Sequence, residues 1–152
     1  EGKIPDYLVH LRPIAPLRNP PKIDRAVEIM LKHLGATSLR SGHKIDTIPQ
    51  KCFGLENGFF VGLFPLDKRP DYHGFPRQLF PPTYKPNGYV DILKSSFVLK
   101  NSVIHGPKII AFLTPDTGDI DNQNDLKYVG TLLRKERFPV YDYLQANFKP
   151  IS

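Results

Sequence analysis

The sequence is poor in cysteine and has no tryptophan, and its single cysteine, Cys52, excludes any intramolecular disulfide. One thiol also excludes zinc sites that are built from several cysteines. No apolar run is long enough to span a bilayer and no segment resembles a signal peptide, so we expect a cytoplasmic protein that does not bind membranes. The five histidines show no metal-ligand spacing, and the sequence gives them no role.

Acidic residues are outnumbered by basic ones, 15 against 21, which gives a formal net charge of +6. Residues 1–85 hold 13 Lys and Arg against 8 Asp and Glu, whereas residues 86–152 hold 8 against 7. A basic first half suits an anionic ligand or a nucleic acid. The basic residues are scattered singly and form no helical stripe, so nucleic-acid binding is the least favoured hypothesis and we expect no nucleic-acid partner.

Proline is abundant, at 16 of 152 residues, which is roughly twice the usual frequency of about 5%. This frequency indicates long ordered loops and argues against a helical bundle. A chain of 152 residues fits one domain that is large enough to bury a core.

Short apolar runs alternate with helical patterns along the chain, which predicts an α/β sheet. The expected strands are residues 7–11, as a buried parallel strand, 89–93 and 108–113. The expected helices are residues 19–35, capped by Asn19 and stopped by Gly35, 95–100, a segment after Asn122, and about 142–147. Residues 37 to about 86 mix prolines, glycines and aromatics, which predicts short strands and loops outside the main sheet.

Polar segments follow the expected strands at residues 12–18, 91–94 and 116–125, and ligands collect at the carboxyl ends of strands in open parallel sheets. The last segment contains Asp119 and Asp121, two carboxylates one residue apart between a strand and a helix. Such a pair suits a hard divalent cation that takes oxygen ligands, such as Mg²⁺. The simpler interpretation is a turn that caps the following helix.

Arg77-Gln78 and Asn87 are further candidates for ligand binding. The planar fork of Arg77 suits a carboxylate or a phosphate, and the amide of Asn87 offers a donor and an acceptor to a hydroxyl-rich substrate. Taken one at a time, a solvated loop charge and an ordinary turn explain these residues equally well.

Five blocks taken together carry more information than any one of them. They are Leu11-Arg-Pro-Ile-Ala-Pro-Leu-Arg18, the helix start from Asn19 to Glu28, Arg77-Gln78, Tyr84-Lys-Pro-Asn-Gly88 and Gly118-Asp-Ile-Asp-Asn-Gln-Asn-Asp125. In order and spacing, over nearly the full 152 residues, this set resembles the acylneuraminate cytidylyltransferases, the enzymes that make CMP-sialic acid.

The resemblance implies a Rossmann-like nucleotidyltransferase sheet with a small protruding dimerisation region at about residues 37–80, and hence a homodimer. Enzymes of this family join CTP to the anomeric hydroxyl of a sugar acid and release pyrophosphate. The resemblance further implies that Asp119 and Asp121 hold Mg²⁺ near the triphosphate. It places Arg77 on the carboxylate of the sugar acid. The other residues that it assigns to the substrate site are Asn87, Gln78 and Arg12.

The chain departs from the family pattern in the expected sugar pocket. Arg12 stands where the family usually has Gln, and Ile14-Ala15 stand where it has Thr-Ser. Asp91 occupies an aromatic position, and a family Phe pair falls near Ile104-His105. These substitutions leave open which sugar acid is used.

The family's first strand and its glycine- and lysine-bearing phosphate loop lie ahead of the matched region and are not found in these 152 residues. We therefore predict that the full-length protein is a cytidylyltransferase-like enzyme and that residues 1–152 alone are inactive. The alternative is a non-catalytic module of the same fold that binds a sugar acid or another anion.

Overall fold

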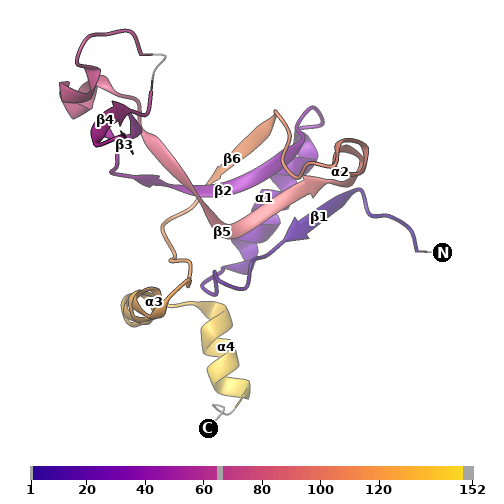
Figure 1. The fold of residues 1–152 in the computed structure, drawn as a ribbon. Helices are drawn as coiled ribbons and strands as arrows, with labels where there is room; N and C mark the ends of the chain where they lie inside the picture. The colour runs from indigo at the N-terminus through magenta and orange to yellow at the C-terminus, as the bar shows by residue number, and fades with distance from the viewer. Residues whose placement is uncertain (1, 65–66, 149–152) are drawn as a thin grey trace. The chain divides into compact units, whose positions relative to one another are not determined.

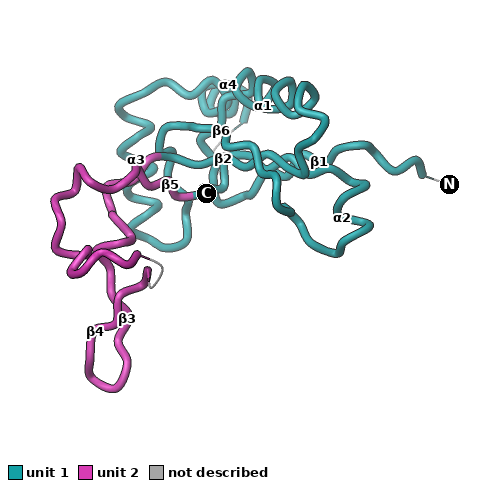
Figure 2. Tube along the Cα trace, turned by 90° about the horizontal axis from the view of Figure 1, so that it is seen from above, with its two compact units in different colours: residues 1–43, 86–152 teal, residues 44–85 magenta. Residues whose placement is uncertain are grey.

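A computed structural model of the chain describes residues 2–64 and 67–148. Its residues divide into two compact units, which Figure 2 colours separately. Unit 1 consists of residues 1–43 and 86–152, and unit 2 consists of residues 44–85. The fold is mixed α/β, as the alternation of apolar runs and helical patterns predicted.

Unit 1 is built on a four-stranded sheet with the strand order β1-β5-β2-β6 (Figure 1). The strands are β1 (Tyr7–His10), β2 (Ser38–Ile45), β5 (Thr83–Lys94) and β6 (Ile109–Leu113). β1 pairs with β5 in antiparallel register, and β2 pairs with β6 in parallel register. Thr37 bonds to Lys94 and Ser41 bonds to Val90, so β5 also runs against β2. Three strands therefore share one direction, and β5 opposes them.

Helix α1 (Pro20–Lys32) supplies the core on one face of this sheet. Its buried Ala26 and Met30 pack in one cluster with Leu39, Val90 and Ile92 of the two central strands. The helix begins with two prolines, which the first turn tolerates because its N–H groups have no partner in the helix. The expected cap residue, Asn19, occupies the N-cap position, but its side chain makes no capping hydrogen bond.

Three further helices follow in unit 1, namely α2 (Ser95–Asn101), α3 (Gln123–Lys135) and α4 (Pro139–Asn147). The start of α3 is fixed by a capping box, in which the Asn122 side chain accepts the Asp125 N–H and the Asp125 side chain accepts the Asn122 N–H. Within residues 2–64 and 67–148, no helix is long and apolar enough to cross a membrane.

Unit 2 consists of short elements, as its proline- and glycine-rich sequence predicted. Strands β3 (Phe53–Glu56) and β4 (Phe59–Gly62) form an antiparallel hairpin. Its turn uses Asn57 and Gly58, both with positive φ, which is the conformation that favours these residue types. Three 3₁₀ turns complete the unit, at Pro49–Lys51, Tyr72–Gly74 and Arg77–Leu79.

The predicted pairing and burial of β1 were wrong. A buried parallel strand was expected, but β1 lies at an edge, pairs only with the antiparallel β5, and leaves three of its four residues exposed. The segment at 37–80, expected as a protruding region, starts with residues that belong to the sheet. Ser38 to Gly42 pair with β6, and the compact unit begins at Lys44 and ends at Lys85.

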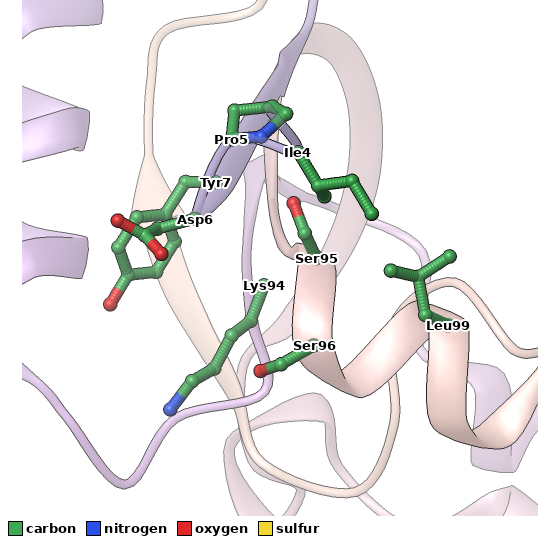
Figure 3. A pocket seen from close by; sticks show the side chains of 8 residues that line it. All are labelled: Ile4, Pro5, Asp6, Tyr7, Lys94, Ser95, Ser96 and Leu99. Atoms are coloured by element: carbon green, nitrogen blue, oxygen red, sulfur yellow. The ribbon is translucent and has the colours of Figure 1, made fainter. Parts of the chain in front are cut away.

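The direction of β5 overturns a second expectation. Residues 91–94 were predicted to share a sheet edge with residues 12–18 and 116–125. Asp91 does pair with His10, the last residue of β1, but β5 runs against its neighbours, so its carboxyl end at Lys94 lies at their opposite ends, beside Tyr7. A cavity of about 370 Å³ opens there, lined in part by Tyr7, Lys94 and Ser95 (Figure 3).

Candidate functional site

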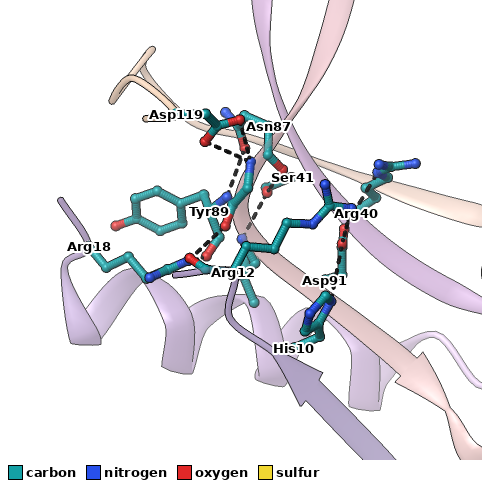
Figure 4. A network of polar contacts seen from close by, with 11 residues as sticks. His10, Arg12, Arg18, Arg40, Ser41, Asn87, Tyr89, Asp91 and Asp119 are labelled. Atoms are coloured by element: carbon teal, nitrogen blue, oxygen red, sulfur yellow. Dashed lines mark hydrogen bonds and ion pairs between the residues drawn. The ribbon is translucent and has the colours of Figure 1, made fainter. Parts of the chain in front are cut away.

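Three of the predicted site residues, Arg12, Asn87 and Asp119, come together at one edge of the sheet of unit 1 (Figure 4). This edge runs across the strands, and β1, β2 and β6 all have their carboxyl ends there, because those three strands share one direction. Arg12 follows β1 and Asp119 follows β6. Asn87 comes from the first half of β5, which reaches the same edge from the opposite direction.

Asp119 is oriented by the main chain of residue 88. Both of its carboxylate oxygens accept the Gly88 N–H, at 3.1 and 3.0 Å. Hydrogen bonds from a backbone N–H to an ionised carboxylate are among the stronger ones in proteins. The side chain is only partly buried, so it remains accessible to a ligand while its direction is fixed.

Gly88 is the residue that permits this close approach. A Cβ placed on residue 88 would lie 3.0 Å from the Asp119 Oδ1 atom, 3.3 Å from the Ala15 Cβ and 3.4 Å from the Arg12 Cβ. The absence of a side chain therefore lets the loop after β1 and the loop after β6 meet over β5. The Asn87-Gly88 pair is part of a strand here, and not the loop turn that the sequence suggested.

Asn87 is buried, with 6% of its surface exposed, and its amide already has protein partners. Its Nδ2 group donates to the Thr114 Oγ1 atom at 2.9 Å and lies 3.2 Å from the His43 Nδ1 atom. Its Oδ1 atom accepts the Tyr89 N–H at 3.3 Å. Asn87 thus connects the ends of β2 and β6 to β5, and this arrangement leaves it mainly a positioning role.

His43 is a site residue that the sequence did not reveal. It lies in β2, its side chain is largely buried, and its Nδ1 atom is 4.0 Å from the Asp116 Oδ1 atom. A neutral imidazole with its proton on Nε2 accepts the Asn87 amide proton at Nδ1. Only its position on a strand that ends at the site could have drawn attention to it.

Arg18 is the second residue missed. Its guanidinium donates to the backbone carbonyls of Gly88, at 2.8 Å, of Tyr89, at 2.7 Å, and of Arg12. Burial lowers the pKa of Arg18, while the charges of Tyr89 and Asp119 oppose that effect. An arginine remains charged at any physiological pH. Arg18 therefore brings a permanent positive charge near Asp119 and ties the loop after β1 to β5.

Arg12 was expected to face the substrate, and its guanidinium contacts a buried carboxylate. The Nη2 atom donates to the Asp91 Oδ2 atom at 3.2 Å. From the resemblance, an amide was expected at position 12 and an aromatic group at position 91. Here the two positions hold opposite charges, which form an ion pair with each other. The positive charge of Arg12 is thus paired with a carboxylate of the same chain.

Asp121 is exposed and lies next to the start of α3. Its backbone N–H donates to the Asp125 carboxylate at 3.0 Å, as does the N–H of Asn122. The turn-and-cap interpretation of this segment is therefore correct for Asn122 and Asp125. It does not involve the carboxylates of Asp119 and Asp121, which remain available to a cation.

Arg77 and Gln78 belong to unit 2, and the structure gives their surroundings within that unit. The Arg77 Nη2 atom donates to the Asp46 Oδ1 atom at 2.6 Å, and both side chains are largely exposed. Gln78 is exposed in the same 3₁₀ turn. Their expected roles on the substrate carboxylate remain predictions.

The geometry defines a mixed α/β domain with a polar site at the carboxyl edge of its sheet. No family model matches the chain, and no curated protein sequence matches it either. A function for this site therefore has to be argued from its residues.

Proposed function

We propose that the protein is a nucleotidyltransferase that activates a sialic-acid-like 2-keto sugar acid with CTP, giving the CMP-sugar and pyrophosphate. The observation that carries the proposal is the position of Asp119. It follows β6, its carboxylate is aligned by the Gly88 N–H, and Arg12 and Arg18 lie on the adjoining loop. The carboxyl ends of strands are where α/β sheets bind nucleotides and phosphorylated ligands.

The carboxylates of Asp119 and Asp121 suit Mg²⁺ better than a metal that needs a complete protein cage. Among the described residues, no group of three or more His, Cys, Asp or Glu side chains is placed to hold a metal ion. Mg²⁺ is commonly bound by one or two carboxylates, with waters and substrate phosphates as the other ligands. When bound, it neutralises the charge of a triphosphate and orients its α-phosphate.

In this scheme each protein group has a defined task. Asp119 and Asp121 hold the cation, and Gly88 fixes the direction of the first carboxylate through its N–H. Arg18 holds the loop that carries Arg12 against β5. Arg77 and Gln78 keep the role that the resemblance implies for them, which is to bind the carboxylate of the sugar acid.

The proposal also includes a homodimer formed through unit 2. The β3-β4 hairpin exposes Leu55, Phe59 and Phe60, each more than 70% accessible. Grouped exposed apolar side chains of this size mark interaction surfaces. Sedimentation of the wild type and of a Phe59→Ser/Phe60→Ser variant tests this, since the variant should sediment as a monomer.

Pyrophosphate release with CTP, Mg²⁺ and a panel of 2-keto sugar acids tests the reaction. We expect turnover by the full-length protein, a loss of at least about 100-fold in Asp119→Asn, and unchanged turnover in Asp24→Asn, an exposed aspartate on α1. No turnover by the full-length protein across the panel would contradict the proposal.

The second candidate is a non-catalytic relative that binds a sugar acid or another anion. The observation that favours it is that Arg12 is paired with Asp91 and that the Asp119 carboxylate already accepts the Gly88 N–H. Calorimetry with CTP separates the two functions. Mg²⁺-dependent CTP binding by the full-length protein supports the enzyme, and sugar-acid binding without CTP binding supports the second candidate.

A further inference from the structure

A buried carboxylate with three basic side chains around it lies in the middle of the sheet. Asp91 is 2% exposed and sits on β5, where its register partner on β1 is His10. The Arg12 Nη2 atom is 3.2 Å from its Oδ2 atom, the Arg40 Nε atom is 3.6 Å from its Oδ1 atom, and the His10 Nδ1 atom is 3.9 Å from Oδ2. Figure 4 shows these three side chains converging on Asp91. Burial lowers the pKa of His105, and the charge of Asp91 opposes that effect.

This cluster faces away from the helix-covered core. Leu39, Val90 and Ile92 pack with α1, and side chains alternate between the two faces of a strand. Arg40 and Asp91, which adjoin them in sequence, therefore point to the other face. On that face the register partner of Arg40 on β6 is Ala111, a small and exposed residue. The guanidinium thus has open space beside it.

The basic groups lie between the carboxylate and the solvent. The side chains of His10, Arg12 and Arg40 are 54%, 35% and 29% exposed, whereas that of Asp91 is 2% exposed. A molecule that approaches this face meets the positive groups first. Two guanidinium charges against one carboxylate leave a positive excess even when both histidines are neutral.

The cluster is also incompletely hydrogen-bonded. Within residues 2–64 and 67–148, the Arg40 guanidinium donates no hydrogen bond. Its Nε atom and the Asp91 Oδ1 atom are buried and make no hydrogen bond among the described residues, because the two atoms lie 3.6 Å apart in a loose ion pair. Arginine guanidinium groups that are partly buried normally donate hydrogen bonds to nearby acceptors. The exposed part of the Arg40 guanidinium is therefore free to donate to a group that binds beside it.

We propose that this cluster is a binding site for a small oxyanion, a carboxylate or phosphate group, held by Arg12, Arg40 and His10. Asp91 lies beneath them and sets the direction of the two guanidinium groups. The planar fork of arginine donates two parallel hydrogen bonds to such a group. The inference rests in part on the proposed function, because Arg12 and Asp91 occupy the sugar pocket that the resemblance implies, but the anion is expected to bind whether or not a nucleotide is present.

Nitrogen-15 NMR of the arginine Nε–H groups tests the site directly, with inorganic phosphate and N-acetylneuraminate as separate probes at constant ionic strength. In the wild type, the Arg12 and Arg40 signals should shift and saturate, while the signal of Arg25 should not. Arg25 is the reference because it is an exposed arginine already paired with Glu28 on α1. The probe that binds more tightly identifies the preferred group as phosphate or carboxylate.

Variants then assign the binding to Arg40. Arg40→Met should weaken binding at least about tenfold, Arg40→Lys should recover part of that loss, and Arg25→Met should change nothing. Equal shifts at Arg12, Arg40 and Arg25 in the wild type, or shifts that never saturate, would overturn the proposal even if Arg40→Met failed to fold. Undiminished binding in a folded Arg40→Met protein would overturn it too. Pyrophosphate release does not enter this test, so its failure and that of the proposed function are separable.

Discussion

Asp119 accepts the backbone N–H of Gly88 with both of its carboxylate oxygens, at 3.1 and 3.0 Å. The donor belongs to the main chain, so no substitution at position 88 other than proline removes it. What a substitution can change is the space that the two residues share. Position 88 therefore controls both the local packing and the direction of the Asp119 carboxylate.

Gly88→Ala should destabilise the protein by about 1–3 kcal/mol, because the added methyl group overpacks the contacts with Asp119 and Ala15. Urea unfolding measures this difference. Gly35→Ala is the matched control, since nothing lies within 4 Å of a Cβ at that position, and its effect should stay within about 0.5 kcal/mol. A Gly88→Ala protein as stable as the wild type would contradict the packing described.

Arg18→Lys should also be destabilising, by about 1–3 kcal/mol, because a single ammonium cannot bond all the carbonyls that the guanidinium reaches. Thermal or urea unfolding checks this. Arg134→Lys, an exposed substitution near the end of α3, serves as the control and should be neutral. Equal stability of the two variants would show that the fork of Arg18 contributes nothing.

Asn122→Ala should lower the free energy of unfolding by about 0.5–2 kcal/mol, because it removes the acceptor that caps α3. Asn124→Ala is the control, since that residue contributes only its backbone N–H to the cap. Circular dichroism during urea unfolding gives both values. If the two variants behave alike, the capping box is not contributing to stability.

The stability of the protein should fall on acidification in a way that depends on His105. Burial lowers the pKa of His105, with the Asp91 charge acting in the opposite direction. The unfolded chain therefore takes up this proton at a higher pH than the folded chain does. Stability linked to this group is full above the unfolded pKa of about 6.5 and decreases as the pH falls toward the folded value.

The slope from one such group is at most about 1.4 kcal/mol per pH unit. Urea unfolding at pH 7.5 and pH 5.5 should show a smaller acid loss in His105→Gln than in the wild type. The comparison removes the contribution of carboxylates, which titrate in both proteins. An equal or larger loss in the variant would mean that His105 is not the group responsible.

Local signals in the sequence predicted local structure well. The start of α3 follows from Asn122 and Asp125 alone, because both partners of the capping box lie within one turn. The beginning of α1 follows from its paired prolines for the same reason, although the side chain of Asn19 does not cap it. The hairpin turn at Asn57-Gly58 is equally local.

Contacts over long sequence separations were not predictable in this way. The direction of β5 depends on the route of residues 44–85, so the placement of the end of β5, at Lys94, beside residues 12–18 was wrong, although Asp91 does contact Arg12. Asn87 meets His43 and Thr114, which are 44 and 27 residues away. No spacing rule links residues so far apart in the sequence, which therefore indicated no role for His43 or Thr114.

The sequence contained both members of the Arg12–Asp91 pair but not their contact. Each appeared as an isolated departure from a family pattern, because the two positions are 79 residues apart. The structure places Asp91 on β5 and Arg12 just after the neighbouring strand β1, so the carboxylate at one position pairs with the positive charge at the other. Arg40, on the strand beyond, carried no sequence signal.

The antiparallel pairing of β2 and β5 has a further consequence for unit 2. These two strands follow one another in the chain apart from residues 44–85, so they form a β-hairpin whose loop has been enlarged into a folded unit. The ends of that loop are fixed beside each other, since the side chains of His43 and Asn87 are 3.2 Å apart. Unit 2 is thus inserted into a β-hairpin, and its first and last residues still belong to the two strands of that hairpin.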